Sequence, residues 1–202
     1  LGRVNTGSVA QRLADTPGVA RTILGAARAA RGMPGADPRA MSHSWLFTGP
    51  PGSGRSLAAI DFAAALMCTD PEEPGCGRCE ACRAVLETKQ HTDLVLVDPQ
   101  EVIIPVDTVR EVIGRAASLP TVAPWRVVIF NNADRLNNNG ANALLKTVEE
   151  PPARTVIIMC APSDAPEDFS QTLRSRCRHL YIPSPSVESI TAQLLSLIHI
   201  SE

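Results

Sequence analysis

The sequence predicts an α/β fold in which helices alternate with the strands of a parallel sheet. Residues 44–49, 125–130 and 155–161 form short, largely apolar runs, as strands buried on both faces of a parallel sheet require. Segments with helical periodicity lie between these runs, and that alternation favours right-handed crossovers. The 202 residues, 44% of them hydrophobic, are enough for one full domain and the start of another.

The first quarter of the chain predicts a helix, a loop, a strand and a second helix. Residues 18–31 are alanine-rich and place apolar side chains on one face of a helix. A loop rich in glycine and proline follows at 32–38, before the strand at 44–49. Residues 56–67 again repeat apolar side chains at helical spacing. A glycine-rich turn therefore joins a buried strand directly to a helix.

The remaining chain continues the alternation. Helices are expected at 107–119 and at 139–148, where Pro151 stops the second one, and a last helix is expected to begin after Pro185. Residues 102–107 predict a further short edge strand, interrupted by a proline. The parallel sheet itself is expected to contain five strands, at 44–49, 93–99, 125–130, 155–161 and 178–182.

Composition limits the classes of function. The net charge of −2 gives no basic footprint, so this chain is not expected to be the main surface that neutralises nucleic-acid phosphates. Of the 19 basic residues only Lys89 and Lys146 are lysine, which indicates the codon bias of a GC-rich genome. No apolar run of about 18 residues and no secretory pattern is present, so we expect a cytoplasmic protein without a membrane span.

The segment GPPGSGRS, residues 49–56, predicts a phosphate-binding loop between a strand and a helix. Gly49, Gly52 and Gly54 let backbone N–H groups close around a phosphate, and the following helix N-terminus adds positive potential. Ser56 is a candidate magnesium ligand. Arg55 stands where this motif carries lysine, and its planar, bulkier guanidinium does not fit the same slot. Nucleotide binding, if it occurs, is expected to be weak.

The segment VVIFNNAD, residues 127–134, ends the strand where such proteins hold magnesium and orient the attacking water with acidic side chains. Here Asn131 and Asn132 occupy both positions, and an amide can neither neutralise magnesium nor act as a base. Asp134 is expected to be a solvated turn residue. With Arg55, these residues predict a dead or very slow ATPase; the alternative is an otherwise normal enzyme.

Four cysteines with paired short spacings, Cys68, Cys76, Cys79 and Cys82, predict a structural zinc site. Four thiolates would leave no open coordination position for water. An iron–sulfur cluster and a set of free thiols or a disulfide are the alternatives. The two other cysteines are expected to be small core residues, Cys160 and Cys177.

The segment LRSRC, residues 173–177, places Arg174 and Arg176 just before the last strand. A lone arginine pair is usually a surface feature. In the context of these motifs, Arg176 is the candidate arginine finger acting on a neighbouring subunit's nucleotide. Ser163, after the fourth strand, is either a sensor of a γ-phosphate or an ordinary loop hydroxyl.

The phosphate loop, the cysteine cluster, NALLKTVEEPP at 142–152 and LRSRC at 173–177 together resemble the delta-prime branch of the bacterial DNA polymerase III clamp-loader family. The resemblance covers roughly residues 10–195 and, with the arginine-rich composition, implies an actinobacterial source. The cysteine module and the last two segments are shared with the gamma/tau subunits, which hydrolyse ATP. Those relatives carry an intact phosphate-loop lysine and an acidic pair, and this sequence departs from them at both places.

The resemblance implies an AAA+ P-loop domain over 1–183 with an inserted four-cysteine zinc module at about 68–82. It also implies the start of a helical lid at 184–195 and a missing collar domain. Residues 196–202 continue neither the helical periodicity of that segment nor any motif, so we expect a non-native tail there. The implied cofactors are structural Zn²⁺ and, weakly, ATP with Mg²⁺. The implied partners are gamma/tau and delta subunits and, through their complex, the sliding clamp and primer–template DNA. An active gamma/tau-like ATPase and a zinc-dependent nucleic-acid binding module are the alternatives.

Overall fold

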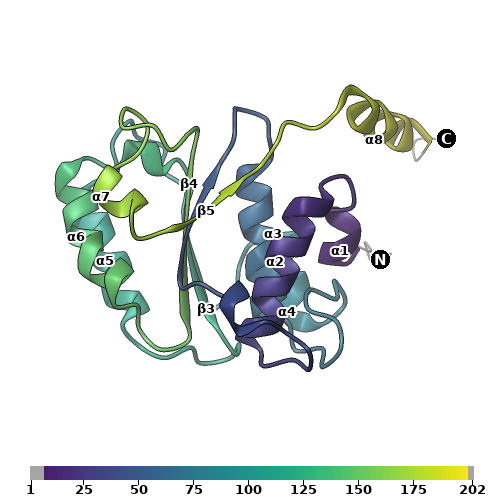
Figure 1. Ribbon diagram of the computed structural model, residues 1–202, viewed down its shortest axis with the longest axis horizontal. Coiled ribbons are helices and arrows are strands. Elements are labelled where there is room, and N and C mark those ends of the chain that lie inside the picture. The colour runs from purple at the N-terminus through teal and green to yellow at the C-terminus, as the bar shows by residue number, and fades with distance from the viewer. Residues whose placement is uncertain (1–6, 200–202) are drawn as a thin grey trace.

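The computed structural model describes residues 7–199 and contains one parallel sheet (Figure 1). Its strands are β1 (Ser44–Thr48), β2 (Leu94–Val97), β3 (Arg126–Phe130), β4 (Thr155–Ala161) and β5 (Arg178–Tyr181). Their spatial order is β2-β3-β4-β1-β5, so β2 and β5 form the two edges. In the register around β1, Leu46 lies beside Met159 of β4 and His179 of β5. The predicted α/β fold with a parallel five-stranded sheet is confirmed.

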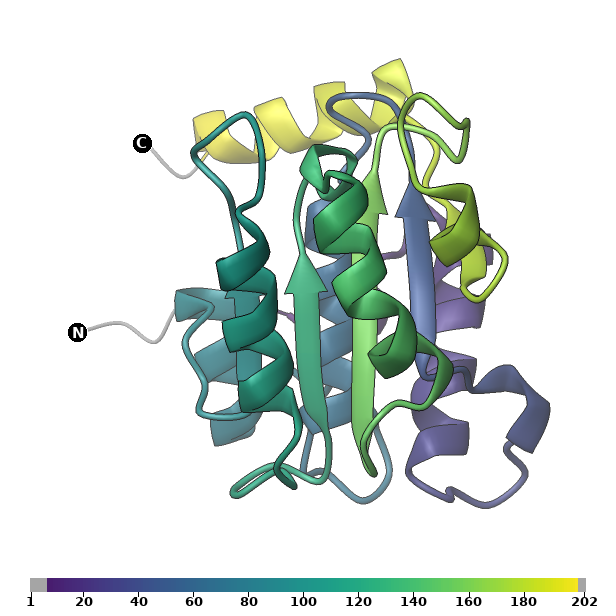
Figure 2. The same cartoon turned by 90° about the vertical axis from the view of Figure 1, so that its left-hand side faces the viewer.

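Helices cover both faces of this sheet (Figures 1 and 2). The first face carries α1 (Val9–Arg12), α2 (Pro17–Ala30), α3 (Arg55–Met67) and, in the cysteine module, α4 (Glu80–Arg83) with the π-helical turn η2 (Ala84–Thr88). The second face carries α5 (Val106–Ala116), α6 (Asn138–Glu149) and α7 (Gln171–Arg174). Two 3₁₀ turns, η1 (Pro38–Ala40) and η3 (Ala133–Arg135), and the last helix, α8 (Val187–His199), complete the elements.

The two apolar cores meet at β1. Trp45 and Phe47 face α3, and their rings lie 5.2 Å and 6.2 Å from the ring of Phe62. Leu46 faces the other way, into the core beneath α5 and α6. All four side chains are fully buried, and burial of each contributes about 1.5–3 kcal/mol. The strand that leads into the glycine-rich loop is therefore fixed from both sides.

Three expectations about element bounds are wrong. Residues 102–107 do not form a strand; only Ile104 makes an isolated bridge, to Leu136, because Pro105 then begins the turn into α5. α5 ends at Ala116 rather than at 119, where the chain turns into a loop held by Asp93. α8 continues to His199, past the expected end of the helical pattern, while 200–202 lie outside the described residues.

The structure also contains short elements that the sequence did not predict. α1, α4 and η2 are each five residues or fewer, too short to show a helical period. Within residues 7–199, no helix is both long enough and apolar enough to cross a bilayer.

Candidate functional site

The glycine-rich loop connects β1 to α3, as its motif predicts. Gly52 and Gly54 have φ angles of +82° and +84°, a region that favours glycine. Gly49 has no room for a side chain, because a Cβ there would collide with the Ile182 carbonyl and the Ser53 hydroxyl. α3 begins without a side-chain cap, so its first N–H groups remain available to an anion.

Arg55 turns back onto this loop. Its Nη1 donates a 2.6 Å hydrogen bond to the Gly49 carbonyl, and the side chain is half-buried. The Nε of Arg55 and the hydroxyl of Ser53 are buried without a hydrogen-bond partner. Buried polar groups are rarely left unpaired, so the loop has donors that fit a phosphate-like ligand. The guanidinium is nevertheless tied to the loop's own backbone.

Asn131 and Asn132 directly follow β3. The Asn131 N–H donates to the Val97 carbonyl at 2.9 Å, and its side-chain Oδ1 is buried without a partner. Asn132 adopts a left-handed conformation with φ +52° and begins η3. Asp134 is exposed, as expected. Asn131 and Asn132 therefore place amides, not carboxylates, directly at the end of β3.

Ser163 follows the carboxyl end of β4, the same end of the sheet at which Asn131 follows β3. Its hydroxyl donates to Asp168 Oδ2 at 2.7 Å and accepts from the Ala165 N–H at 3.1 Å. These contacts stabilise the loop after β4. A role for Ser163 as a phosphate sensor stays a prediction.

Arg176 lies just after α7 and reaches across to the end of α6. Its Nε forms a short ion pair with the Glu149 carboxylate, and Nη1 donates to the Thr172 carbonyl at 2.7 Å. The two charged side chains are 36% and 46% exposed, and exposed ion pairs of this kind contribute little stability. Arg176 is therefore paired locally but accessible.

Arg174 belongs to a different network, which the sequence did not reveal. Its Nε donates to Asp164 Oδ2 at 3.0 Å, and this hydrogen bond lowers the pKa of Asp164. Asp164 also lies 3.6 Å from His179 Nδ1, and His179 Nε2 lies 2.5 Å from the Thr48 hydroxyl. Thr48 precedes the phosphate loop. The network joins segments more than 100 residues apart, which leaves no local pattern to recognise.

The four clustered cysteines meet as predicted. The Sγ atoms of Cys68, Cys76, Cys79 and Cys82 all lie within 4.8 Å of one another, and those of Cys68 and Cys79 are 3.9 Å apart. Zinc–sulfur bonds of about 2.3 Å in a tetrahedron give sulfur–sulfur distances of about 3.8 Å. The described cysteines are all free thiols. The geometry fits a four-coordinate metal ion.

The backbone around the cluster stabilises negative sulfur atoms. N–H groups donate to Cys68, Cys76 and Cys79 at 3.3–3.4 Å. A hydrogen bond from the Cys82 thiol, with further backbone donors, lowers the pKa of Cys68, while the same hydrogen bond and burial raise the pKa of Cys82. A thiolate is the form that binds metal. The donor set is closed to further ligands, as a structural zinc site requires.

The cysteine module is docked on the start of the chain. The Val9 N–H donates to the Gly75 carbonyl at 2.8 Å. Gly75 has φ +74°, and a Cβ at this position would collide with the Val9 side chain. α1 in turn is held by a 2.5 Å ion pair from Arg12 to Asp61, a buried residue of α3. The module thus contacts, through α1, the helix that starts at the phosphate loop.

Known proteins match most of this chain. A family model described as DNA polymerase III, delta subunit, matches residues 36–186. DNA polymerase III subunit delta' of Pseudomonas aeruginosa is 36% identical over 147 residues, covering 71% of this chain and 44% of that protein. The gamma/tau subunit of Mycobacterium tuberculosis is 32% identical over 163 residues, covering 78% of this chain and 28% of that protein.

Among solved structures, a DNA polymerase III gamma subunit-related protein of Thermotoga maritima has a TM-score of 0.50 at 21% identity. The match covers 70% of this chain and 41% of that one, and at this identity it supports the fold alone. The chain spans less than half the length of each of these relatives.

Proposed function

Because the chain belongs to the DNA polymerase III delta-subunit family, we propose that it acts as a delta-prime subunit of a bacterial clamp loader. In this role it helps load the sliding clamp onto primed DNA during replication. The observation that carries the proposal is the family match over residues 36–186 together with the asparagine pair at the end of β3. Its proposed partners are gamma/tau and delta subunits in the cytoplasm, and clamp and primer–template DNA through the assembled complex.

The chain's own nucleotide site is proposed to be degenerate. Its glycine-rich loop presents backbone N–H groups to a phosphate, but the Arg55 guanidinium is bonded to the Gly49 carbonyl at 2.6 Å. Asn131 and Asn132 supply neither a negative ligand for magnesium nor a base that orients water. ATP with Mg²⁺ is therefore bound weakly and hydrolysed slowly, if at all, by this chain alone.

Arg176 is proposed to act in trans on the nucleotide of a neighbouring subunit. A guanidinium near a γ-phosphate offsets the negative charge that develops in the transition state, and such fingers contribute about 10³–10⁵-fold in rate. The pair with Glu149 is partly exposed, and a phosphate offers a stronger, doubly charged partner than this carboxylate. On assembly, Arg176 would leave Glu149 and pair with the nucleotide phosphate of the neighbouring subunit.

Zinc at the four cysteines is proposed to be structural. The metal, when bound, crosslinks the end of α3, at Cys68, to the start of α4, at Cys79 and Cys82. The surrounding N–H groups and the docking of Gly75 on Val9 hold the module in place.

The decisive experiment compares Arg176→Ala with a matched control, Arg83→Ala, in the assembled complex. Arg83 is exposed on α4, away from α7. We expect both variants to assemble, and only Arg176→Ala to reduce DNA-stimulated ATP hydrolysis and clamp loading, by at least about tenfold. Equal rates for wild type and Arg176→Ala would contradict the trans-acting role.

The gamma/tau-like ATPase is the second candidate function, favoured by the 32% identity to a gamma/tau subunit. Steady-state ATP turnover by the isolated protein distinguishes the delta-prime function from the gamma/tau-like ATPase. Sustained turnover that disappears when the phosphate loop is altered would favour the ATPase.

A further inference from the structure

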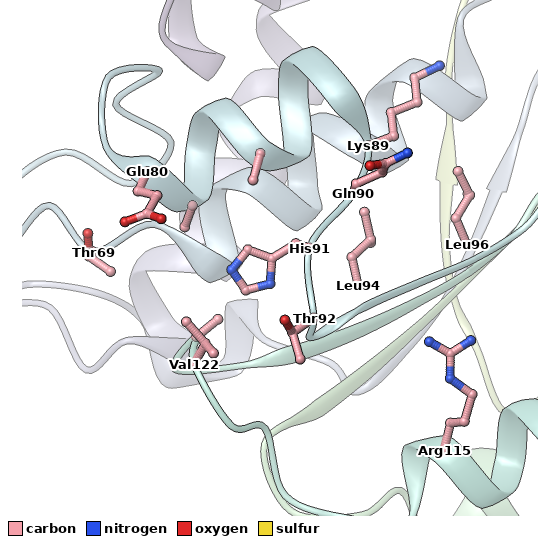
Figure 3. A pocket seen from close by; sticks show the side chains of 13 residues that line it. Thr69, Glu80, Lys89, Gln90, His91, Thr92, Leu94, Leu96, Arg115 and Val122 are labelled. Atoms are coloured by element: carbon pink, nitrogen blue, oxygen red, sulfur yellow. The ribbon is translucent and has the colours of Figure 1, made fainter.

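A cavity among the described residues lies away from the phosphate loop, beside the free edge of β2. Its volume is about 850 Å³. We call it the β2-edge groove. One wall comes from α4 and the segment after η2, and the other from the end of α5 and the loop before β3 (Figure 3). The lining residues that matter here are Glu80, Lys89, His91, Leu94, Leu96 and Arg115.

The floor of this groove is an unpaired strand edge. The Val127 N–H donates to the Asp93 carbonyl at 3.0 Å, and the Asn131 N–H donates to the Val97 carbonyl at 2.9 Å. In a parallel ladder the backbone groups of successive residues face opposite sides. The backbone groups of Leu94 and Leu96 therefore face away from β3, toward the groove.

Of these four outward N–H and carbonyl groups, only one makes a backbone hydrogen bond. The Leu94 N–H donates to the His91 carbonyl at 3.0 Å. Within residues 7–199, the Leu94 carbonyl and both the N–H and the carbonyl of Leu96 have no backbone partner. Open edges of this kind pair readily with an added strand.

The side chains around the edge are hydrogen-bond donors. His91 Nδ1 accepts from the Asp93 N–H at 3.0 Å, so the hydrogen of the neutral ring is on Nε2, which can donate. Figure 3 shows Arg115 pointing from its helix toward the strand, with Lys89 at the rim. Within the described chain, neither cation has an ion-pair partner. Glu80 is the one carboxylate among the lining residues.

We infer that the β2-edge groove binds an extended, acidic segment of a partner protein, which adds to the sheet as a strand beside β2. The backbone of such a segment supplies the alternating donors and acceptors that Leu94 and Leu96 lack. Because side chains alternate between the two faces of a strand, its carboxylates lie on the α5 side, where they meet Arg115. Small apolar side chains between the acids cover Leu94 and Leu96. The four residues of β2 give a pairing length of about 13 Å.

Other occupants fit less well. A nucleic acid offers phosphates to Arg115 and Lys89, but it has no regular pattern of N–H and carbonyl groups for the strand edge. A second copy of this chain would bring one of its own free edges, either β2 with Lys89 and Arg115 beside it or β5 with Arg178. Those side chains place positive charge against positive charge. The acidic segment satisfies both the backbone and the side chains.

The test uses the zinc-loaded chain and two capped peptides, one of four Glu-Val repeats and one of four Lys-Val repeats, in calorimetric titrations. We expect the acidic peptide to bind at least about tenfold more tightly than the basic one. Its binding should slow the amide exchange of Leu96, measured by NMR. The variant Arg115→Ala should weaken binding, and Arg83→Ala, outside the groove, should not.

The strand pairing itself is tested by Leu96→Pro. Its outward N–H is not part of the β2–β3 ladder, so proline is tolerated at this edge position. We expect about tenfold weaker peptide binding, while Leu96→Ala, which keeps the N–H, binds nearly normally. If circular dichroism shows that Leu96→Pro is unfolded, the Leu96 amide exchange and the Arg115→Ala result decide alone.

Five results would overturn the inference. These are no binding of the acidic peptide, equal binding of the two peptides, unchanged binding by Arg115→Ala, unchanged binding by folded Leu96→Pro, or unchanged Leu96 exchange on peptide addition. Displacement of the peptide by single-stranded DNA would identify a nucleic-acid site instead. Self-association of the chain that Leu96→Pro abolishes would identify a second copy as the occupant.

Discussion

Arg126 donates a 3.0 Å hydrogen bond to Asp93 inside the protein, and the two side chains are 7% and 0% exposed. The carboxylate also accepts hydrogen bonds of 2.8 Å from the backbone N–H groups of Thr121, Val122 and Ala123. A single buried charge thus fixes the loop between α5 and β3. This loop forms one wall of the β2-edge groove.

Replacement of Asp93 is expected to destabilise the fold strongly. Asp93→Ala leaves the Arg126 charge buried and unpaired, which costs about 3–5 kcal/mol. Asp107→Ala is the matched control, because its ion pair with Arg110 is exposed and contributes at most about 1 kcal/mol. Urea unfolding of both variants measures the difference. A similar decrease in unfolding free energy for Asp93→Ala and Asp107→Ala would contradict the structural role of Asp93.

The same carboxylate predicts an acid-sensitive stability. Burial opposes its ionisation, but three backbone N–H groups and Arg126 outweigh burial and lower the pKa of Asp93 to about 2. Because the pKa is lower in the folded state, the stabilisation is complete above about pH 4 and is lost as the pH falls toward 2. The difference corresponds to about 2 kcal/mol. Unfolding free energies measured between pH 5 and 2 should fall less steeply for Asp93→Asn than for wild type.

Metal removal is expected to loosen the cysteine module and the start of the chain together. A chelator should increase hydrogen exchange at the Val9 N–H, which donates to Gly75, because metal binding and local folding are coupled. Cys79→Ser should lose zinc in elemental analysis, while Cys177→Ala, which alters a buried cysteine outside the cluster, should retain it. Zinc-free wild-type protein with four freely titrating thiols would refute the site.

ATP turnover by the isolated chain is expected to stay below about 1 s⁻¹, the low end of the usual enzyme range. The combined change Arg55→Lys, Asn131→Asp and Asn132→Glu should tighten nucleotide binding, since it frees the Gly49 carbonyl and restores a magnesium ligand. The single change Arg55→Lys measures the contribution of the phosphate loop separately from that of the restored magnesium ligand. Fluorescent-nucleotide titration measures affinity, and wild-type turnover well above this limit would contradict the degenerate site.

The sequence predicted those features that depend on neighbouring residues. Continuous apolar runs located β1, β3 and β4, and the glycine-rich turn between β1 and α3 and the cysteine cluster were located from spacing alone. The edge strand expected at 102–107 was wrong, because Pro105 turns the chain into α5. The partners of Arg176 and His179 could not be predicted, since Glu149 and Thr48 are 27 and 131 residues away and meet them only in the folded protein.

The docking of Gly75 on Val9 has a practical consequence for handling this protein. α1 is held both by the cysteine module and by the Arg12–Asp61 ion pair, and Asp15 just beyond it accepts a 2.7 Å hydrogen bond from Ser189 of α8. A truncation or a purification tag that intrudes on residues 8–15 would therefore separate three regions at once. Expression designs should leave this stretch intact and begin any fused sequence well before it.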